Sequence, residues 1–224
     1  MEPNWQLTRK RTTLEKRARI VHAIRAFFIQ RNFLEVETPQ RIPANAPEFN
    51  IDAIESEGWY LQTSPELAMK RLLAAGYERL FQICHCWRSG ERGKRHLPEY
   101  TMLEWYRSNS DYHSLMTDCE QLFSTLLEKD ELSYQGKTIN LIHPWQQITV
   151  SDAFKIYTNT TVEEALAEDC FDELIVTEIE PQLPTGRPLF LTEYPISQAA
   201  LARQKPNNPS VAERFELYIG GMEL

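Results

Sequence analysis

The sequence predicts an α+β fold, because helical and strand-like patterns alternate along the chain. Residues 14–28 and 111–129 carry apolar side chains at the spacing of amphipathic helices. Other segments alternate between two faces, or form short apolar runs, as β-strands do. These strand candidates are residues 81–88, 99–107, 188–194 and 211–219. We therefore expect strands flanked by helices.

Composition and charge narrow the classes of protein that fit. The chain has 224 residues, of which 42% are hydrophobic and 25% charged, as in ordinary globular proteins. Its net charge of −8 argues against a surface that grips a nucleic-acid backbone over a wide area. The balance favours a small-molecule or protein substrate.

The lack of a recognisable targeting signal and the pattern of cysteines predict a cytoplasmic protein. We find no apolar run long enough for a membrane span, and no apolar segment follows the basic N-terminus as in a signal peptide. The four cysteines form no disulfide framework, which favours a reducing compartment. Cys84-His85-Cys86 suggests a metal site, but strand alternation puts His85 on the other face. Structural cysteines are therefore the preferred interpretation.

The first predicted helix begins near Thr12 and Glu15, which have capping-box spacing. Asn32 is a reasonable stop, and residues 33–37 read as a short strand. The apolar stripe of the helix predicts burial but does not say against what. Its members are Leu14, Ala18, Val21, Ile24 and Phe28.

A second, shorter helix follows the strand predicted at residues 59–62. Pro65 fits the first helical position, and Glu66 lies in the first turn, after Thr63 and Ser64. By itself, Glu66 reads as a surface carboxylate that the helix dipole favours.

The strands 81–88 and 99–107 enclose a charged loop and form the most informative part of the chain. Alternation puts Arg88 at the end of one face, and its planar guanidinium suits an oxyanion. On the other strand, Tyr100, Glu104 and Tyr106 share a face. This face would carry groups for phosphate, an aromatic ring and a cation, although an exposed hairpin with a solvated loop is the alternative. The loop holds Glu91, Arg92, Lys94, Arg95 and His96.

The second half begins with a helix over residues 111–129, which Asp111 caps. Short strands broken by Pro144 come next, and Ser151 is predicted to cap the following helix. Two more helical segments follow, with acidic residues that are expected to form a solvated face. Residues 111–183 are therefore interpreted as a region that includes a peripheral helical layer. The helical segments are residues 162–168 and 171–183.

The end of the chain predicts a pair of carboxylates. A buried strand at residues 188–194 precedes a loop and the strand 211–219, and Gly220-Gly221 makes a turn. Across this turn, Glu216 and Glu223 would approach each other, and carboxylate oxygens beside a triphosphate are what Mg²⁺ uses. Two exposed carboxylates are the default alternative.

The hairpin resembles motif 2 of class II aminoacyl-tRNA synthetases, in particular their lysyl branch. The family pattern is FRNE, a loop, and RHNPEFTMLE. This chain has WRSGE from Trp87 and RHLPEYTMLE from Arg95, with no gap in spacing. Gly90 replaces the acid of FRNE, so adenine recognition could shift to Glu91 or to backbone groups, and Tyr100 keeps a stacking face. The resemblance extends over residues 14–224.

Within that branch, the chain is most similar to the short paralogues that attach lysine to elongation factor P. The resemblance implies a class II catalytic fold, an antiparallel sheet flanked by helices, over residues 1–224. It also implies a homodimer built by residues 14–39, as motif 1. The implied activity is ATP-dependent formation of lysyl-adenylate, with Mg²⁺, and transfer of lysine to a lysine side chain of elongation factor P.

The resemblance also implies roles for single residues. Arg88 would be the catalytic residue and would hold the ATP α-phosphate and the lysine carboxylate. Arg95 and His96 would meet the outer phosphates, and Tyr100 would stack on adenine, with Glu91 beside it. The lysine pocket would be made by Glu66 for the α-amino group, Tyr106 for the ε-amino group, and Ser64. Mg²⁺ would be held by Glu216 and Glu223.

Several alternatives stay open. In the family, a further strand and motif 3 follow the position of Leu224, so the resemblance implies a C-terminally incomplete fold, natural or not, and leaves activity of this chain open. A tRNA acceptor is disfavoured, because only about a dozen residues precede the first helix and no oligonucleotide-binding barrel fits there. Besides the elongation factor P ligase and the tRNA ligase, a third interpretation is an inactive paralogue that binds ATP weakly. The choice between α-lysine and β-lysine is also open.

Overall fold

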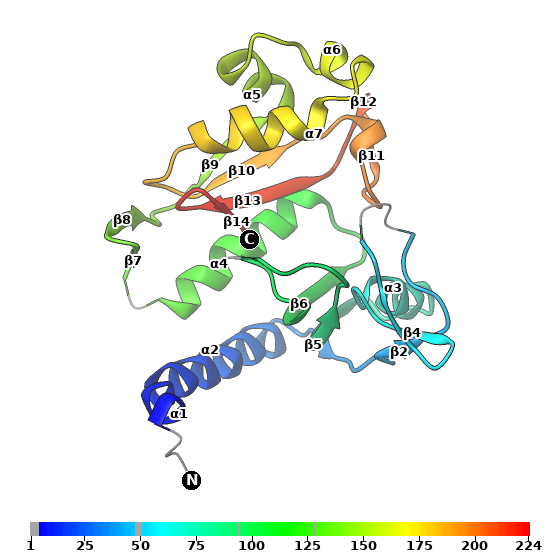
Figure 1. Ribbon diagram of the computed structural model, residues 1–224, viewed down its shortest axis with the longest axis vertical. Coiled ribbons are helices and arrows are strands. Elements are labelled where there is room, and N and C mark those ends of the chain that lie inside the picture. The colour runs from blue at the N-terminus through cyan, green and yellow to red at the C-terminus, as the bar shows by residue number, and fades with distance from the viewer. Residues whose placement is uncertain (1–4, 48–50, 94, 128) are drawn as a thin grey trace. The chain divides into compact units, whose positions relative to one another are not determined.

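A computed structural model describes residues 5–47, 51–93, 95–127 and 129–224. The chain divides into two compact units, Met1–Ser110 and Asp111–Leu224. Both combine helices with mainly antiparallel strands (Figure 1), so the predicted α+β class is confirmed. That residues 1–224 form one catalytic domain stays a prediction. Within the described ranges, no helix has both the length and the hydropathy needed to cross a membrane.

The first unit holds helices and two small sheets in its described part. Its helices are α1 (Trp5–Arg9), α2 (Arg11–Gln30) and α3 (Glu66–Ala74). One sheet has the order β1-β5-β6, from Leu34–Glu35, Arg79–Trp87 and Glu99–Arg107. The other has the order β2-β4-β3, from Arg41–Ile42, Trp59–Leu61 and Ile54–Ser56. The strand predicted at residues 33–37 is thus shorter than expected.

Helix α2 begins differently from the prediction. Its N-cap is Lys10, which makes no side-chain capping hydrogen bond, and the helix is already formed before Thr12. Glu15 instead pairs with Arg11 at 3.0 Å, one turn earlier. The predicted capping box of Thr12 and Glu15 is therefore wrong. The end of the helix agrees with the prediction, because Asn32 takes the left-handed conformation, with φ 60°.

The aromatic core of the first unit lies under the last turns of α2. Phe28 stacks on Phe81 of β5, with ring centroids 4.9 Å apart, and meets Phe27 and Phe33 edge-on at 5.1 Å. The apolar stripe predicted for this helix is buried only at this end. Closer to the start of α2, Leu14 is 56% exposed and Ile20 is 48% exposed.

The second unit is built on a sheet of order β14-β13-β10-β9. Its strands are β9 (Gln146–Thr149), β10 (Leu189–Thr192), β13 (Phe215–Ile219) and β14 (Met222–Glu223). Smaller pairs are β7 (Glu131–Tyr134) with β8 (Lys137–Asn140), and β11 (Gln204–Lys205) with β12 (Asn208–Ala212). The helices are α4 (Tyr112–Leu126), α5 (Val150–Tyr157), α6 (Val162–Ala167) and α7 (Phe171–Leu174). Short helical turns η1 (Ile175–Ile179), η2 (Glu180–Gln182) and η3 (Ile196–Gln198) complete it.

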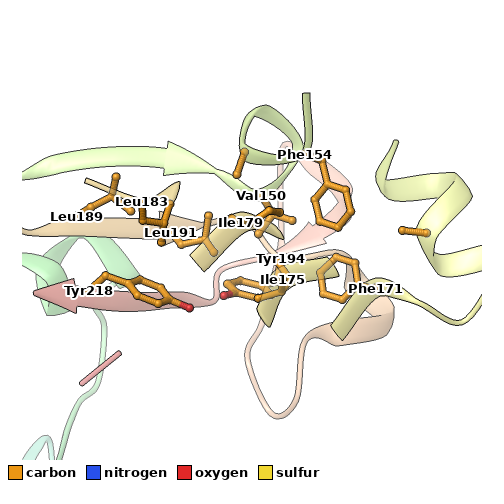
Figure 2. Packing of buried hydrophobic residues seen from close by; sticks show 12 residues of the cluster. Val150, Phe154, Phe171, Ile175, Ile179, Leu183, Leu189, Leu191, Tyr194 and Tyr218 are labelled. Carbon is orange, nitrogen blue, oxygen red and sulfur yellow. The ribbon is translucent and has the colours of Figure 1, made fainter. Parts of the chain in front are cut away.

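Helices cover both faces of this sheet (Figure 1). On one face, α5, α6 and the segment from α7 to η2 enclose the main hydrophobic cluster, whose packing Figure 2 shows. On the other face, Phe123 of α4 contacts Trp145, which contacts Phe190 of β10 at 5.7 Å between ring centroids. All four residues of β10 are buried, as predicted for this strand.

Two capping predictions in this unit have different outcomes. The side chain of Asp111 accepts a hydrogen bond from the Ser114 backbone N–H at 3.0 Å, which confirms it as the cap of α4. The cap of α5 is Thr149, whose hydroxyl accepts from the backbone N–H of Asp152, so the prediction of Ser151 is wrong.

The strand predicted at residues 211–219 is interrupted and forms the end of β12 and all of β13.

Candidate active site

Strands β5 and β6 pair in antiparallel fashion, and the faces that the alternation predicts coincide. Residues on one face of β5 stand opposite residues on the same face of β6. The pairs on this face, named here the β5–β6 face, are Leu80 with Tyr106, Gln82 with Glu104, Cys84 with Met102, and Cys86 with Tyr100. Arg88 follows β5, and its backbone N–H donates to the Pro98 carbonyl at 2.9 Å.

Arg88 is prepared for an anionic ligand. Its guanidinium carbon lies 5.4 Å from the centroid of the Tyr100 ring, and one terminal nitrogen lies 3.9 Å from the Glu91 carboxylate. The Nε of Arg88 is buried and has no hydrogen-bond partner among the described residues. Because a buried N–H without a partner is costly, this atom favours a ligand that accepts a hydrogen bond.

In the loop between the strands, the side chains predicted to contact the outer phosphates of ATP are exposed to solvent. Gly90 has φ +76°, a conformation that glycine adopts without strain. Glu91 is half-buried next to Arg88, whereas Arg95 and His96 are exposed. Lys94 lies outside the described residues. The structure therefore brings Glu91 and Tyr100 to Arg88, and leaves the positions of Arg95 and His96 on a bound phosphate as a prediction.

A carboxylate cluster lies further along the same face. Glu104 accepts a hydrogen bond from the Ser64 hydroxyl at 2.8 Å and another from the Tyr106 hydroxyl. Burial raises the pKa of Glu104, and these two hydrogen bonds oppose that effect. The two hydrogen-bond partners of Glu104 are neutral, and the charge of Lys70 acts on it only as the smallest of the named effects, so its negative charge is suited to a cationic amino group.

Glu66 lies in the first turn of α3, where the helix N-terminus favours a carboxylate. Its backbone N–H donates to the Ser64 hydroxyl at 3.0 Å, and its carboxylate forms a salt bridge with Lys70 one turn later. The charge of Glu66 contributes to the raised pKa of Glu104, so the two carboxylates are close enough to interact. The predicted trio of Ser64, Glu66 and Tyr106 therefore meets around Glu104.

The second unit holds a separate cluster around Glu216. One oxygen of this carboxylate accepts hydrogen bonds from the Tyr194 and Tyr218 hydroxyls, which point toward each other in Figure 2. The other oxygen accepts from the guanidinium of Arg214, whose central carbon lies 4.3 Å from the Tyr194 ring centroid. The Tyr218 hydroxyl also lies 3.1 Å from a Glu180 oxygen, so its single proton is shared between the two carboxylates. Three donor groups thus face Glu216, and a carboxylate has capacity for about four.

Glu223 stands opposite Tyr218 in the β13–β14 hairpin, so the predicted glycine turn brings it toward Glu216. Burial, followed by the charges of Glu216 and Glu180, raises the pKa of Glu223 to about 7. The positive charge of Arg214 opposes this shift but does not cancel it. The carboxylate oxygens of Glu216 and Glu223 therefore fit a hard divalent cation such as Mg²⁺.

No group of three or more His, Cys, Asp or Glu side chains in the described residues is arranged to hold a metal ion. A pair of carboxylates would suffice for Mg²⁺, because this ion usually keeps water and takes substrate phosphates beside one or two carboxylates. The metal-binding role of Glu216 and Glu223 remains a prediction.

Sequence reasoning missed several members of these clusters. Glu104 was assigned to the correct face, but not as the acceptor that joins Ser64 to Tyr106. In the second unit, strand alternation put Arg214 and Tyr218 on the face of Glu216, which could have indicated their contact. Glu180 belongs to a segment interpreted as an acidic solvated face, and nothing local indicated its hydrogen bond from Tyr218.

Comparisons with known proteins agree with the motif-2 resemblance. Residues 5–224 match the family model of class II tRNA synthetases (D, K and N). The chain is 36% identical to an elongation factor P–(R)-beta-lysine ligase of Pseudoalteromonas translucida, over 98% of this chain and 74% of that protein. Proteins of the same name from Vibrio cholerae and Sodalis glossinidius are 35% and 38% identical, over 99% of this chain and 74% of each.

These relatives confirm the predicted branch, that of ligases of the elongation factor P–lysine ligase type. With a family model that spans all but the first four residues, and a motif-2 hairpin whose two strands pair with the predicted faces together, the chain belongs to the class II tRNA synthetases of the D, K and N group.

Proposed function

We propose that residues 1–224 act as a catalytic domain that activates a lysine-type amino acid with ATP and transfers it to a lysine side chain of elongation factor P. The observation that supports this most is the composition of the β5–β6 face. It combines a guanidinium at one end, whose buried N–H has no partner among the described residues, with the Glu104 carboxylate further along the strands. An amino acid with both a carboxylate and a distant ammonium group has charges complementary to these two groups.

In this proposal, Arg88 binds the substrate carboxylate and the ATP α-phosphate. The amino acid carboxylate attacks the α-phosphorus, the bond to the bridging oxygen breaks, and pyrophosphate leaves with its electrons. Negative charge grows on the α-phosphate oxygens, and a fixed guanidinium stabilises it more strongly than water would. Tyr100 offers its ring to adenine, and Glu91 its carboxylate, while Arg95 and His96 meet the outer phosphates.

At the other end, Glu104 and Glu66 bind the amino groups of the substrate. Ser64 and Tyr106 hold Glu104 by hydrogen bonds, so its position is set before the substrate arrives. A cation that enters this cluster neutralises a carboxylate whose pKa burial has raised. The relatives are named for (R)-β-lysine, so we propose this amino acid ahead of α-lysine.

Mg²⁺ would be held by Glu216 and Glu223, and when bound it supplies positive charge to the phosphates of ATP. Tyr194, Tyr218 and Arg214 keep Glu216 in place by hydrogen bonds, so that its remaining lone pair is directed consistently. The second chemical step needs no covalent enzyme intermediate. The acceptor amine attacks the adenylate carbonyl, an amide bond forms, and AMP leaves.

We also propose that the chain forms a homodimer through residues 14–39. Leu14, Ile20 and Leu34 are 56%, 48% and 49% exposed, and they lie on the helix and strand that motif 1 contributes. Uncovered apolar side chains on one long helix are what a second copy would cover.

The test is mass spectrometry of elongation factor P after incubation with the 224-residue chain, ATP, Mg²⁺ and either (R)-β-lysine or α-lysine. Bulk tRNA is offered in parallel, and an elongation factor P with arginine at its acceptor lysine is the control. We expect a gain of one lysyl group on the wild-type acceptor alone. Charged tRNA would favour the tRNA ligase alternative. No gain, together with no amino-acid-dependent pyrophosphate exchange, would overturn the proposal.

A further inference from the structure

Three sulfur atoms meet on the β5–β6 face. The Sγ atoms of Cys84 and Cys86 lie 3.9 Å apart, and Cys86 Sγ lies 4.0 Å from the Sδ of Met102. Met102 is also the residue directly opposite Cys84 in the pairing of the two strands. Cys86 therefore lies within 4.0 Å of the sulfur of each of the other two side chains.

Strand geometry explains why these sulfurs gather. Cys84 and Cys86 are two residues apart on one strand, so both point to the same face, and Met102 reaches them from the neighbouring strand. His85 points to the opposite face, where its Nδ1 lies 3.5 Å from Glu99. The cluster therefore contains only sulfur donors. Two of them are cysteines and the third is a methionine, so it is not one of the groups of three His, Cys, Asp or Glu side chains that were absent from the described residues.

The spacing suits a metal ion in a trigonal site. Each of the two separations, 3.9 Å for Cys84 with Cys86 and 4.0 Å for Cys86 with Met102, fits a pair of sulfurs bound to one ion at a metal–thiolate bond length of about 2.3 Å and an angle of about 120°. Thiolate and thioether sulfurs are soft donors, and among biological metals they select Cu(I). Zinc is a poorer match, because its protein sites are tetrahedral and need a fourth ligand.

The surroundings of the cluster keep it dry and reduced. Cys84 is 6% exposed and Cys86 is fully buried, and both thiols are free. The Gln62 side-chain amide lies 3.5 Å from the Cys84 sulfur, and this contact, after the larger one with Cys86, helps to lower the pKa of Cys84. The contact with Cys84, together with burial, raises the pKa of Cys86, so this thiol keeps its proton until a metal–sulfur bond replaces it.

We propose that Cys84, Cys86 and Met102 form a trigonal binding site for a monovalent soft metal ion, Cu(I), with Ag(I) as its analogue. On binding, both cysteine thiols lose a proton to solvent, two metal–thiolate bonds form, and Met102 donates a sulfur lone pair. No oxidant or reductant is needed, because the ion arrives and stays as Cu(I).

The position of the site predicts a consequence for the reaction. Cys86 stands directly opposite Tyr100, and Arg88 follows it by two residues. An ion here would add a net negative complex beside the guanidinium assigned to ATP, so Cu(I) should inhibit the ligase. This consequence rests on the proposed function, whereas binding of the metal does not.

The test begins with binding alone. The reduced chain is titrated anaerobically with Cu(I) in competition with bathocuproine disulfonate, and the bound form is measured by X-ray absorption. We expect one Cu(I) per chain with three sulfur neighbours at about 2.3 Å. Cys86→Ser should weaken binding by more than about 100-fold, since even a residue that only supports a metal ligand contributes up to that much. Met102→Leu, a volume-conserving change, should reduce the sulfur count from three to two.

Matched controls come from the other two cysteines. Cys119 lies buried in α4 and Cys170 precedes α7, so a Cys119→Ser, Cys170→Ser double variant should bind Cu(I) as wild type does. Circular dichroism checks that every variant is folded. Absence of binding by the folded wild-type chain would overturn the proposal, and so would binding that survives Cys86→Ser or is lost in the control. Binding without inhibition would leave the site standing and remove the predicted consequence.

Discussion

Ser64 donates a hydrogen bond of 2.8 Å to Glu104, which links the start of α3 to the middle of β6. The two residues lie 40 positions apart in the sequence. Glu104 receives a second hydrogen bond from Tyr106, and burial raises its pKa. The contact therefore positions a carboxylate that has neutral partners and lies near a second carboxylate, Glu66. Such a group gains most when a cation binds to it.

The first prediction concerns Glu104 and the amino acid substrate. Glu104→Gln keeps the shape of the side chain and can retain the contact with Ser64, but removes the charge. Because a hydrogen bond to a charged group contributes about 1.5–3 kcal/mol, the KM for the amino acid should rise about 10- to 100-fold. Pyrophosphate exchange at varied amino acid concentration measures it, with KM for ATP as the internal reference.

Glu99→Gln is the matched control for this experiment. Glu99 lies on the same strand, is exposed, and contacts His85 on the opposite face. Its replacement should leave the KM for the amino acid unchanged. Equal effects of the two substitutions, or a rise in the KM for ATP alone, would contradict the role given to Glu104.

A second prediction separates the shape of Arg88 from its charge. Arg88→Lys keeps the positive charge but loses the planar fork and the Nε that is buried without a partner in the described part of the chain. Removing one donor that stabilises a growing oxyanion costs about 10²–10³-fold in rate, and we expect a loss of kcat in that range. Arg92→Lys, at an exposed position of the same loop, should leave kcat within about twofold of wild type. Comparable losses in both variants would show that the loop needs arginine in general.

Local pattern was enough to predict the β5–β6 hairpin. The alternation over residues 81–88 and 99–107 predicted which residues share a face, and the observed strands pair with those faces together. The Asp111 cap and the turn at Gly220-Gly221 were predictable for the same reason, because one short segment contains all the information. The helix starts were not predictable in this way. Helix α2 begins one residue before Thr12 without a side-chain cap, and Thr149, two residues before Ser151, caps α5.

The residues that make up the clusters around Glu104 and Glu216 are brought together by tertiary contacts. Glu104 meets Ser64 through the packing of α3 on the sheet, and Glu216 meets Tyr194 across paired strands 22 residues apart. Spacing in the sequence carries no signal for such pairs. The sulfur cluster shows the same limit, since Cys84 and Cys86 alone suggested structural cysteines and Met102 became a third donor only through strand pairing.

The third prediction follows from Glu223, whose pKa is raised from 4.5 to about 7 in the folded chain. Between these values the folded chain binds more protons than the unfolded chain, so its free energy of unfolding falls as pH rises through about 7. Glu223→Gln removes this dependence. The difference in unfolding free energy between wild type and this variant should therefore decrease from about pH 6 to about pH 8, measured by urea unfolding without Mg²⁺.

Glu173→Gln provides the control for that series, because Glu173 is exposed on α7. Its difference from wild type should stay constant over the same pH range. A wild-type chain that gains stability relative to Glu223→Gln as pH rises would contradict the raised pKa of Glu223.

The last prediction concerns the exposed apolar face of α2. Ile20 is 48% exposed there, and the proposed dimer would bury it in both copies, since a two-fold interface repeats each contact. Burying an isoleucine contributes about 1.5–3 kcal/mol, so Ile20→Glu should raise the dimer dissociation constant by more than about 100-fold. Sedimentation equilibrium measures this. Ile156→Glu makes the same change at an exposed position of α5, outside residues 14–39, and should leave the dimer intact. Monomeric wild-type chain, or equal dissociation of both variants, would mean that this face serves another purpose.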